Sequence, residues 1–262
     1  MFGVVPKPLW SRAAPADEFN RIQLDTNCIV VRTPLDVVVI DSGFGTKLSD
    51  KEQQQLAVEQ PLNLAEGMRE RGIDPDEVTL ILPSHLHFDH SCGLTYLDED
   101  GHLCPTFPNA KIVVQRAEWE DALGNHPELA GNYPVDELRQ LERWGRFTPV
   151  DGTFEPTPGF RVKPTGGHTR GHQMIQISSH GEQAVYLGDV CPTTAHLKTF
   201  WTMAYDLFPL NVRQLKPKLL GKAIKRQQWV LFDHDPETPA ARLELGRKNY
   251  PVVCESKTQG DL

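Results

Sequence analysis

The sequence predicts an α/β protein, because two kinds of segment alternate along its 262 residues. One kind is a short apolar, β-branched run of strand length, and the other carries apolar residues at helical spacing. Hydrophobic residues make up 39% of the chain, which together with 20 glycines is typical of a globular protein. We expect a single domain over residues 1–262, with strands and helices forming one α/β fold.

The chain begins with two strands that we expect to form a hairpin, 27–32 and 37–40, joined by the turn sequence 33–36. Asp41-Ser42-Gly43 then predicts a turn directly after the second strand. The elements expected after this turn are a helix over 62–71, strands over 78–82 and 110–114, helices over 117–123 and 136–144, strands over 160–162, 174–178 and 184–187, a helix over 212–225, a strand over 228–232, a helix over 238–247 and a strand over 252–254.

Three details of the helices are predicted more finely. Glu118, Glu120 and Asp121 are expected on the solvent side of helix 117–123. Pro217 is expected to interrupt or kink helix 212–225, because proline removes a backbone hydrogen bond. The polar, proline-bounded segment 125–149 is interpreted as a helical insertion, and its apolar residues make it a candidate homodimer surface; they are Leu138, Leu141 and Trp144.

Charge and composition exclude several classes of function. The net charge of −8 argues against partners that need a basic face, namely nucleic acids and anionic membranes. Apolar runs are of strand length, shorter than the roughly 18 residues of a membrane span, and the start lacks a basic signal-peptide region, so a cytoplasmic location is expected. The five cysteines include no CxxC pair, so neither a disulfide framework nor a zinc ribbon is indicated.

A cluster of histidines follows the predicted strand 78–82. The sequence His85-Leu86-His87-Phe88-Asp89-His90 places three imidazoles and a carboxylate within six residues. Neutral nitrogens and ionised oxygens of this kind are the ligands of a metal centre. In extended chain His85 and His87 point the same way, while Asp89 and His90 turn toward a neighbouring ion, so one segment can serve two metals.

Three more candidate ligands lie far along the chain. His168 sits in a glycine-rich loop, Asp189 follows the predicted strand 184–187, and His234 follows strand 228–232. Loops at strand ends are where α/β proteins gather their active sites. The sequence therefore predicts one site assembled from distant segments.

These residues resemble the metallo-β-lactamase superfamily, whose dinuclear hydrolases carry an HxHxDH motif followed by a histidine, an aspartate and a histidine. The resemblance covers nearly the whole chain and implies an αββα sandwich, two mixed β-sheets flanked by helices. It implies that His85, His87 and His168 bind a first metal, that Asp89, His90 and His234 bind a second, and that Asp189 bridges them. It also implies that Asp41 and His172 support the ligands without binding metal themselves. His172 ends the loop Gly167-His168-Thr169-Arg170-Gly171-His172.

Two divalent ions per chain are implied; zinc is expected, and iron, manganese or cobalt also suit these ligands. Ions about 3.5 to 4 Å apart lower the pKa of a shared water, so that a bridging hydroxide can attack a carbonyl. Asp89 would pass the proton onward. No serine or cysteine nucleophile is needed.

Within the superfamily, the motif and the spacing of the ligands look like the N-acyl homoserine lactonases, which act in quorum quenching. The implied partner is a small ester or lactone substrate. Tyr205 is the candidate for contacting the substrate carbonyl, because the tyrosine that lactonases place after the bridging aspartate is replaced here by Pro192-Thr193-Thr194. The apolar residues expected to receive an acyl chain are Phe2, Phe44, Phe88, Trp201, Met203 and Tyr205.

Alternatives remain open at this stage. The same site suits an organophosphate triesterase or another ester or thioester hydrolase of the superfamily. A non-catalytic, metal-stabilised scaffold is the alternative outside enzymes. It is disfavoured because structural zinc sites are closed and four-coordinate, whereas seven shared ligands leave open positions on two ions.

Overall fold

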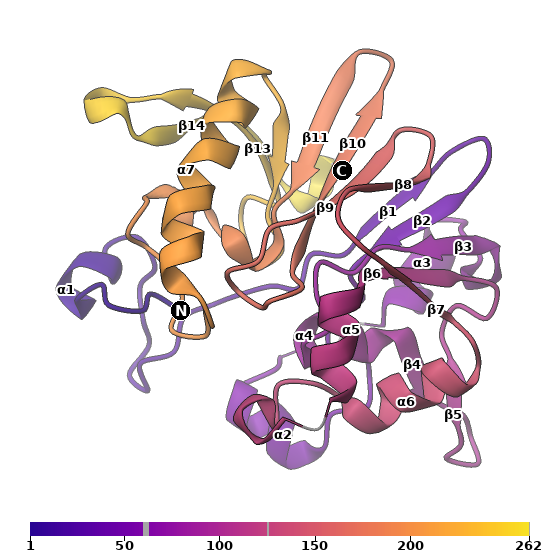
Figure 1. Ribbon diagram of the computed structural model, residues 1–262. Helices are drawn as coiled ribbons and strands as arrows, with labels where there is room; N and C mark the ends of the chain where they lie inside the picture. Colours follow the sequence, from indigo (N-terminus) through magenta and orange to yellow (C-terminus); the bar gives the residue numbers. More distant parts are fainter. Residues whose placement is uncertain (60–62, 125, 262) are drawn as a thin grey trace. The chain divides into compact units, whose positions relative to one another are not determined.

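The computed structural model describes residues 1–59, 63–124 and 126–261 (Figure 1). The chain divides into two compact units. Unit 1 consists of Met1–Asn27 with Gly152–Leu262, and unit 2 is Cys28–Asp151. The single domain expected over residues 1–262 stays a prediction.

Unit 2 contains a five-stranded sheet of order β1-β2-β3-β6-β7. β1 and β2 form the expected antiparallel hairpin, and the other neighbours in the sheet are parallel. The elements of unit 2 are β1 (Ile29–Arg32), β2 (Val37–Ile40), α2 (Asp50–Leu56), α3 (Leu64–Glu70), β3 (Val78–Ile81), α4 (Phe88–Ser91), β4 (Thr95–Leu97), β5 (Leu103–Pro105), β6 (Lys111–Gln115), α5 (Arg116–Leu123), α6 (Val135–Arg143) and β7 (Phe147–Val150). The helix expected from residue 62 is therefore α3, and residue 62 itself lies outside the described residues.

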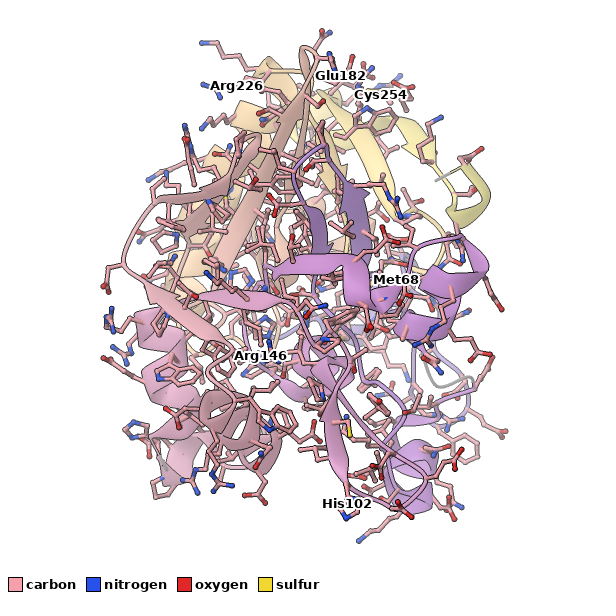
Figure 2. The ribbon with its side chains drawn as sticks, turned by 90° about the vertical axis from the view of Figure 1, so that its right-hand side faces the viewer. Met68, His102, Arg146, Glu182, Arg226 and Cys254 are labelled. Atoms are coloured by element: carbon pink, nitrogen blue, oxygen red, sulfur yellow. The ribbon has the colours of Figure 1, made fainter. Side chains whose placement is uncertain are left out.

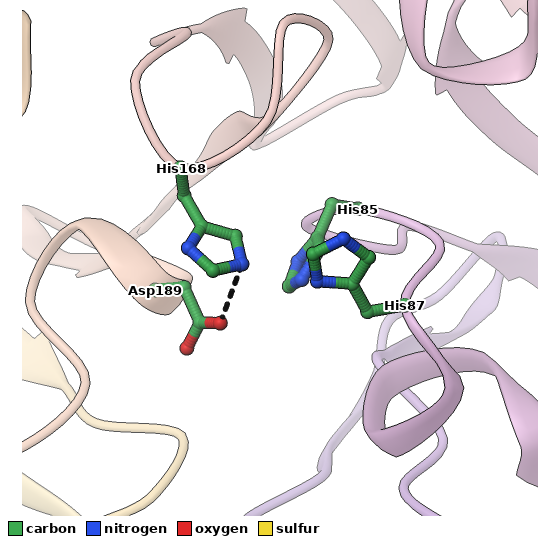
Figure 3. A group of neighbouring side chains, drawn as sticks. All are labelled: His85, His87, His168 and Asp189. Carbon is green, nitrogen blue, oxygen red and sulfur yellow. Dashed lines mark ion pairs between the residues drawn. The ribbon is translucent and has the colours of Figure 1, made fainter. Parts of the chain in front are cut away.

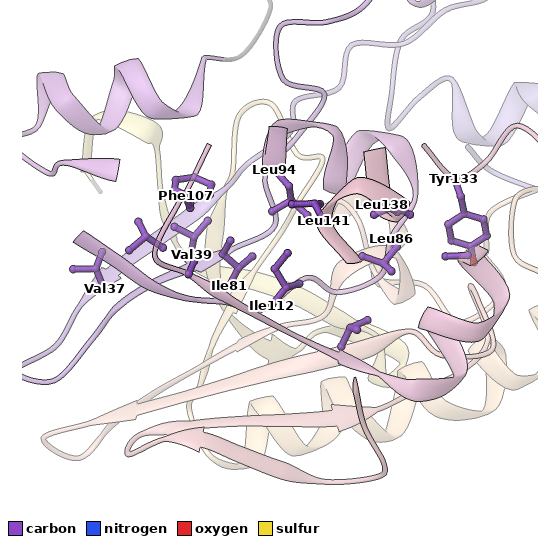
Figure 4. Close-up of a cluster of buried hydrophobic side chains, with 14 of the residues drawn as sticks. Val37, Val39, Ile81, Leu86, Leu94, Phe107, Ile112, Tyr133, Leu138 and Leu141 are labelled. Carbon is purple, nitrogen blue, oxygen red and sulfur yellow. The ribbon is translucent and has the colours of Figure 1, made fainter. Parts of the chain in front are cut away.

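The core of unit 2 packs alternate strand residues against helices, as Figure 4 shows. Val39, Ile81 and Ile112 come from three neighbouring strands, and Met68 of α3, labelled in Figure 2, joins them. Burying these side chains stabilises the unit by about 1.5 to 3 kcal/mol each.

The apolar face of the 125–149 segment lies in this same core. Leu138 and Leu141 of α6 are buried within it, and Trp144 packs against it. The apolar residues that suggested a dimer surface are therefore packed within the unit's own core and do not support that surface, and the homodimer itself stays a prediction.

Unit 1 contains a seven-stranded sheet of order β14-β13-β12-β11-β10-β9-β8. Within it β11 and β12 are parallel, while the other neighbours are antiparallel. Its elements are α1 (Lys7–Trp10), β8 (Phe154–Thr157), β9 (Phe160–Pro164), β10 (Gln173–Ser179), β11 (Glu182–Tyr186), α7 (Pro209–Lys225), β12 (Trp229–Leu231), β13 (Ala240–Leu245) and β14 (Pro251–Lys257).

One expectation about unit 1 is wrong, and another is wrong in part. The helix expected over 238–247 is the strand β13, which pairs with β12 on one side and β14 on the other. Ala and Leu favour helices, but Leu243 is buried in the unit's core, and pairing on both edges outweighs the local preference. Pro217 lies inside α7, which continues through it from Pro209 to Lys225, so the expected interruption is wrong, while a kink at Pro217 stays a prediction (Figure 1).

Short 3-10 helices connect these elements. They are η1 (Pro75–Glu77), η2 (Cys92–Leu94), η3 (Pro127–Leu129), η4 (Gly188–Val190), η5 (Thr194–Leu197), η6 (Arg247–Asn249) and η7 (Gln259–Asp261). In the part of the chain that the structure describes, no helix combines the length and apolar character needed to cross a membrane.

Candidate metal centre

Three predicted ligands follow the end of β3 in unit 2. His85, His87 and His90 are all buried. The ring centroid of His85 lies 4.4 Å from that of His87 and 4.1 Å from that of His90. The HxHxDH segment thus gathers its imidazoles into one buried cluster, because α4 turns the chain back at Phe88.

Asp41 and Ser84 hold two of these imidazoles. The Asp41 carboxylate accepts hydrogen bonds from the backbone N–H and the hydroxyl of Ser84, at 2.6 and 2.8 Å, and its Oδ2 lies 2.8 Å from His90 Nδ1. Because the Ser84 hydroxyl donates to Asp41, it can accept from His85 Nδ1, 3.0 Å away. Both rings then carry their proton on Nδ1, and their Nε2 has the lone pair that binds metal.

Asp41 belongs to a tightly packed turn. Ser42 donates from both its N–H and its hydroxyl to the carbonyl of His90, at 2.8 and 3.0 Å. Gly93 passes so close that an added Cβ would lie 2.0 Å from the Ser42 carbonyl oxygen. Glycine is therefore required where the turn after β2 meets the segment after His90.

Glu118 of α5 hydrogen-bonds to the backbone of the same motif. It is fully buried, and its Oε1 accepts a hydrogen bond of 3.0 Å from the backbone N–H of Leu86, between His85 and His87. The expectation that Glu118 faces solvent is therefore wrong. Its carboxylate is retained in the core because it pairs with a backbone donor that would otherwise need a partner.

In unit 1, strand register brings Asp189 and His234 together. Tyr186 of β11 pairs with Leu231 of the parallel strand β12, and each ligand follows its strand at the same distance in sequence. Carboxyl ends of parallel strands meet at one sheet edge. Asp189 Oδ1 consequently lies 3.3 Å from His234 Nε2.

His168 reaches the same edge from the loop before β10, since β10 runs antiparallel to β11. Its Nε2 lies 3.0 Å from Asp189 Oδ2, the ion pair drawn in Figure 3, and its Nδ1 lies 3.1 Å from Asp206 Oδ1. Figure 3 also draws His85 and His87 of unit 2. Burial disfavours the charged imidazolium, but the carboxylates of Asp189 and Asp206 outweigh it and raise the pKa of His168 to about 10.

Two hydrogen bonds hold the loop that carries Asp206 in place. Asp206 Oδ2 accepts from the backbone N–H of Met203 at 2.9 Å, and the buried Lys216 donates to the carbonyl of Trp201 at 2.6 Å. These bonds fix the carboxylate that orients His168.

A backbone carbonyl and a hydroxyl group hold two further histidines of unit 1, His234 and His172. His234 Nδ1 lies 2.7 Å from the carbonyl oxygen of Asp25, which can only accept, so the proton is on Nδ1. His172 Nδ1 lies 2.6 Å from the hydroxyl of Thr165, and its ring centroid is 6.1 Å from that of His168. His172 is thus a neighbour of the candidate ligand.

Asp89 differs from the other predicted ligands in exposure. Its side chain is 22% exposed, and its Oδ2 lies 3.8 Å from His90 Nε2. A carboxylate next to an imidazole, yet reachable by water, suits both metal binding and proton transfer.

The predicted substrate residues divide into a buried and an exposed set. Phe2 and Trp201 contact each other with ring centroids 5.5 Å apart, and both are buried, as is Met203. Tyr205 is 61% exposed. Phe44 and Phe88 of unit 2 are half-buried and lie 5.6 Å apart.

The donor set fits divalent metal ions. Buried imidazoles whose Nδ1 is held by an acceptor present Nε2, and the nearby carboxylates stabilise a positive charge, as the raised pKa of His168 shows. Aspartates and histidines that could hold an ion are present in both units. Sequence reasoning missed Ser84, Asp206, Asp233 and the carbonyl of Asp25, which no motif marks.

Comparison with known proteins agrees with this arrangement. Residues 21–225 match the family model described as the metallo-beta-lactamase superfamily. The chain belongs to this superfamily. Its fold is the metallo-β-lactamase fold, with mixed β-sheets and flanking helices, as the resemblance implied.

Relatives and solved structures extend the comparison. An N-acyl homoserine lactonase of a Bacillus species is 29% identical over 190 residues, 69% of this chain and 63% of the relative. A lactonase of Bacillus thuringiensis is 32% identical over 168 residues, 63% of this chain and 59% of the relative. The chain therefore spans less than two thirds of the length of these lactonases.

A solved structure covers more of the chain. The probable metal-dependent hydrolase from Staphylococcus aureus is 33% identical, with a TM-score of 0.88 over 98% of this chain and 91% of that one.

Proposed function

We propose that the protein is a dinuclear metal-dependent hydrolase. His85, His87 and His168 would hold the first ion, Asp89, His90 and His234 would hold the second, and Asp189 would be shared by both. The observation that carries this proposal is the fixed orientation of the imidazoles: Asp41, Asp206 and the carbonyl of Asp25 hold the Nδ1 atoms of His90, His168 and His234, respectively. Histidines that bind metal through Nε2 usually have Nδ1 hydrogen-bonded to a carboxylate or a carbonyl, as these three do.

When bound, the two ions supply a nucleophile from water near neutral pH and polarise the bond to be cleaved. The chain's own residues then move protons and orient the substrate. Asp89, whose carboxylate is partly exposed, accepts the proton and delivers it to the leaving alkoxide. Tyr205 presents its exposed hydroxyl to the carbonyl of the substrate.

The proposed substrate is an N-acyl homoserine lactone, opened at its ester bond. Similarity to two Bacillus lactonases supports this choice. An acyl chain needs an apolar surface, and the half-buried Phe44 and Phe88 offer one in unit 2. In unit 1, Phe2 and Trp201 contact each other, and both are buried, as is Met203. Zinc is the proposed metal, because imidazole and carboxylate are its usual ligands.

Proton release tests the proposal directly. Metal-quantified protein is mixed at near-neutral pH with short-chain and long-chain N-acyl homoserine lactones and, separately, with the phosphotriester paraoxon. We expect rapid lactone opening by the wild type and at least about a hundredfold slower opening by Asp89→Asn. Turnover of paraoxon alone would identify a triesterase, and no turnover of any ester with two metals bound would favour the non-catalytic scaffold.

A further inference from the structure

Asp233 is a buried carboxylate that the predicted set of seven ligands does not include. It directly precedes His234, two residues after the end of β12, and it is 1% exposed. An oxygen of Asp233, an oxygen of Asp189 and a ring nitrogen of His234 all lie within 4.8 Å of one another. All three residues belong to unit 1.

The separations are those of ligands that share an ion. Two atoms that each lie about 2.0–2.2 Å from one ion are roughly 3 to 4.4 Å apart, depending on the angle between them. His234 Nε2 lies 3.7 Å from Asp233 Oδ2 and 3.3 Å from Asp189 Oδ1. Both distances fall inside this interval, so one ion can contact all three groups after small movements.

Electrostatics favour the same conclusion. Asp189 and Asp233 are both buried, and two carboxylates held this close in a protein interior repel each other. A divalent cation between them converts the repulsion into attraction. We propose that Asp233 is an additional ligand of the second metal ion, beside Asp189 and His234. This inference rests on the proposed function and adds a residue to its metal site.

An additional carboxylate changes which metal the second position prefers. With Asp233, that position has three carboxylates, from Asp89, Asp189 and Asp233, and two imidazoles, whereas the first has three imidazoles and the shared Asp189. Oxygen-rich sets with five or more ligands suit Mn²⁺, Fe²⁺ or Co²⁺, while the first set suits Zn²⁺. The second position therefore accommodates these ions as well as zinc, whereas the first favours zinc.

Metal titration of Asp233→Asn and Asp233→Ala tests the inference. Metal-free wild type and variants are titrated with Co²⁺ against a chelator of known affinity, and the visible spectrum is recorded after each equivalent. We expect the first equivalent to bind alike in all three proteins. The second equivalent should bind at least about 100-fold more weakly in both variants. Losing a residue that only hydrogen-bonds to a ligand typically weakens metal binding by roughly 10–100-fold. The visible spectrum of the second Co²⁺ should also change.

Asp235→Asn is the matched control for a structural effect. Asp235 also follows β12, and its carboxylate accepts hydrogen bonds from the N–H and hydroxyl of Thr194 and from the N–H groups of Glu237 and Thr238, at 2.7 to 3.1 Å. Its loss should lower the Tm of the metal-free protein. Asp233→Asn should leave that Tm unchanged or raise it, because it removes a repulsion.

The outcomes separate the two proposals. A wild type that binds fewer than two ions overturns the proposed function. A wild type that binds two ions, with second-ion affinity in both Asp233 variants less than tenfold weaker, overturns only the role of Asp233. The role of Asp233 as a ligand is also overturned if Asp233→Asn destabilises the metal-free protein as much as Asp235→Asn does.

Discussion

Three histidines are held by three different acceptors. His90 uses the carboxylate of Asp41, His168 uses that of Asp206, and His234 uses the carbonyl of Asp25. The HxHxDH motif and the downstream loops let the sequence predict the histidines themselves. The resemblance also pointed to Asp41, but Asp206 and the carbonyl of Asp25 could not be predicted, because they are single common residues that tertiary structure brings to the histidines.

At this scale Asp89→Asn separates metal binding from proton transfer. The amide keeps a ligand oxygen but cannot carry the proton, so most of the metal should remain. Transition-state stabilisation should fall by at least about 2.7 kcal/mol, a hundredfold in kcat/KM. Elemental analysis alongside lactone kinetics measures both, and turnover near the wild-type rate in a metal-replete variant would end the assignment of Asp89.

His168 and His172 lie in one loop and differ in their proposed roles, so they form a matched pair. His168→Ala should remove a ligand and reduce bound metal sharply. His172→Ala should retain most of the metal, because the Nδ1 of His172 contacts Thr165 and its ring only neighbours His168. Equal metal loss in the two variants, measured by elemental analysis, would show that the ligand has been misassigned.

Elements were predictable where local pattern and tertiary environment agree. The hairpin of β1 and β2 and the helix α5 follow from their sequences, but β13 does not, because its alanines and leucines favour a helix while its pairing with β12 and β14 decides the outcome. The buried side of α5 was also mistaken, since nothing local shows that Glu118 meets the backbone of Leu86.

Glu118 of α5 gives the prediction that belongs to this scale. Glu118→Ala leaves the N–H of Leu86 without its acceptor in the core, which should cost about 1 to 3 kcal/mol of unfolding free energy. Glu118→Gln keeps an acceptor oxygen and should cost less. Urea denaturation of the metal-free protein measures both, with the exposed Glu120→Ala on the same helix as control; a Glu118→Ala effect as small as that of Glu120→Ala would refute the role.

At the scale of the whole molecule, both ends of the sequence contribute to unit 1. Phe2 stacks on His196 with ring centroids 4.8 Å apart, and His196 Nε2 lies 3.2 Å from the carbonyl oxygen of Met1. Gly3 has a φ of +50°, and an added Cβ there would lie 2.7 Å from the carbonyl oxygen of Thr202. The alternation of strands and helices predicts the α/β class, but such long-range packing cannot be read from local patterns.

His196 makes the stability of the protein depend on pH. Burial, with the nearby Lys216, lowers the pKa of His196 from 6.5 to about 3. Because the folded pKa lies below the unfolded value, this contribution is fully present above pH 6.5 and is lost as the pH falls from there toward 3. The loss should be about 1.4 kcal/mol per pH unit.

Urea denaturation of metal-free wild type and His196→Asn at pH 7.5 and pH 5.5 isolates this term, since other titrating groups are common to both proteins. The wild type should lose about 1.4 kcal/mol more than the variant between the two conditions. Parallel pH dependence of the two proteins would contradict a neutral, buried His196.

The central proposal is that this chain holds two metal ions through its histidines and aspartates. The most direct test is elemental analysis of the wild type and of His168→Ala after loading with zinc and exhaustive dialysis. Two ions per wild-type chain and a clear loss in the variant are predicted. One ion or none in the wild type, or an unchanged count in the variant, would contradict the account.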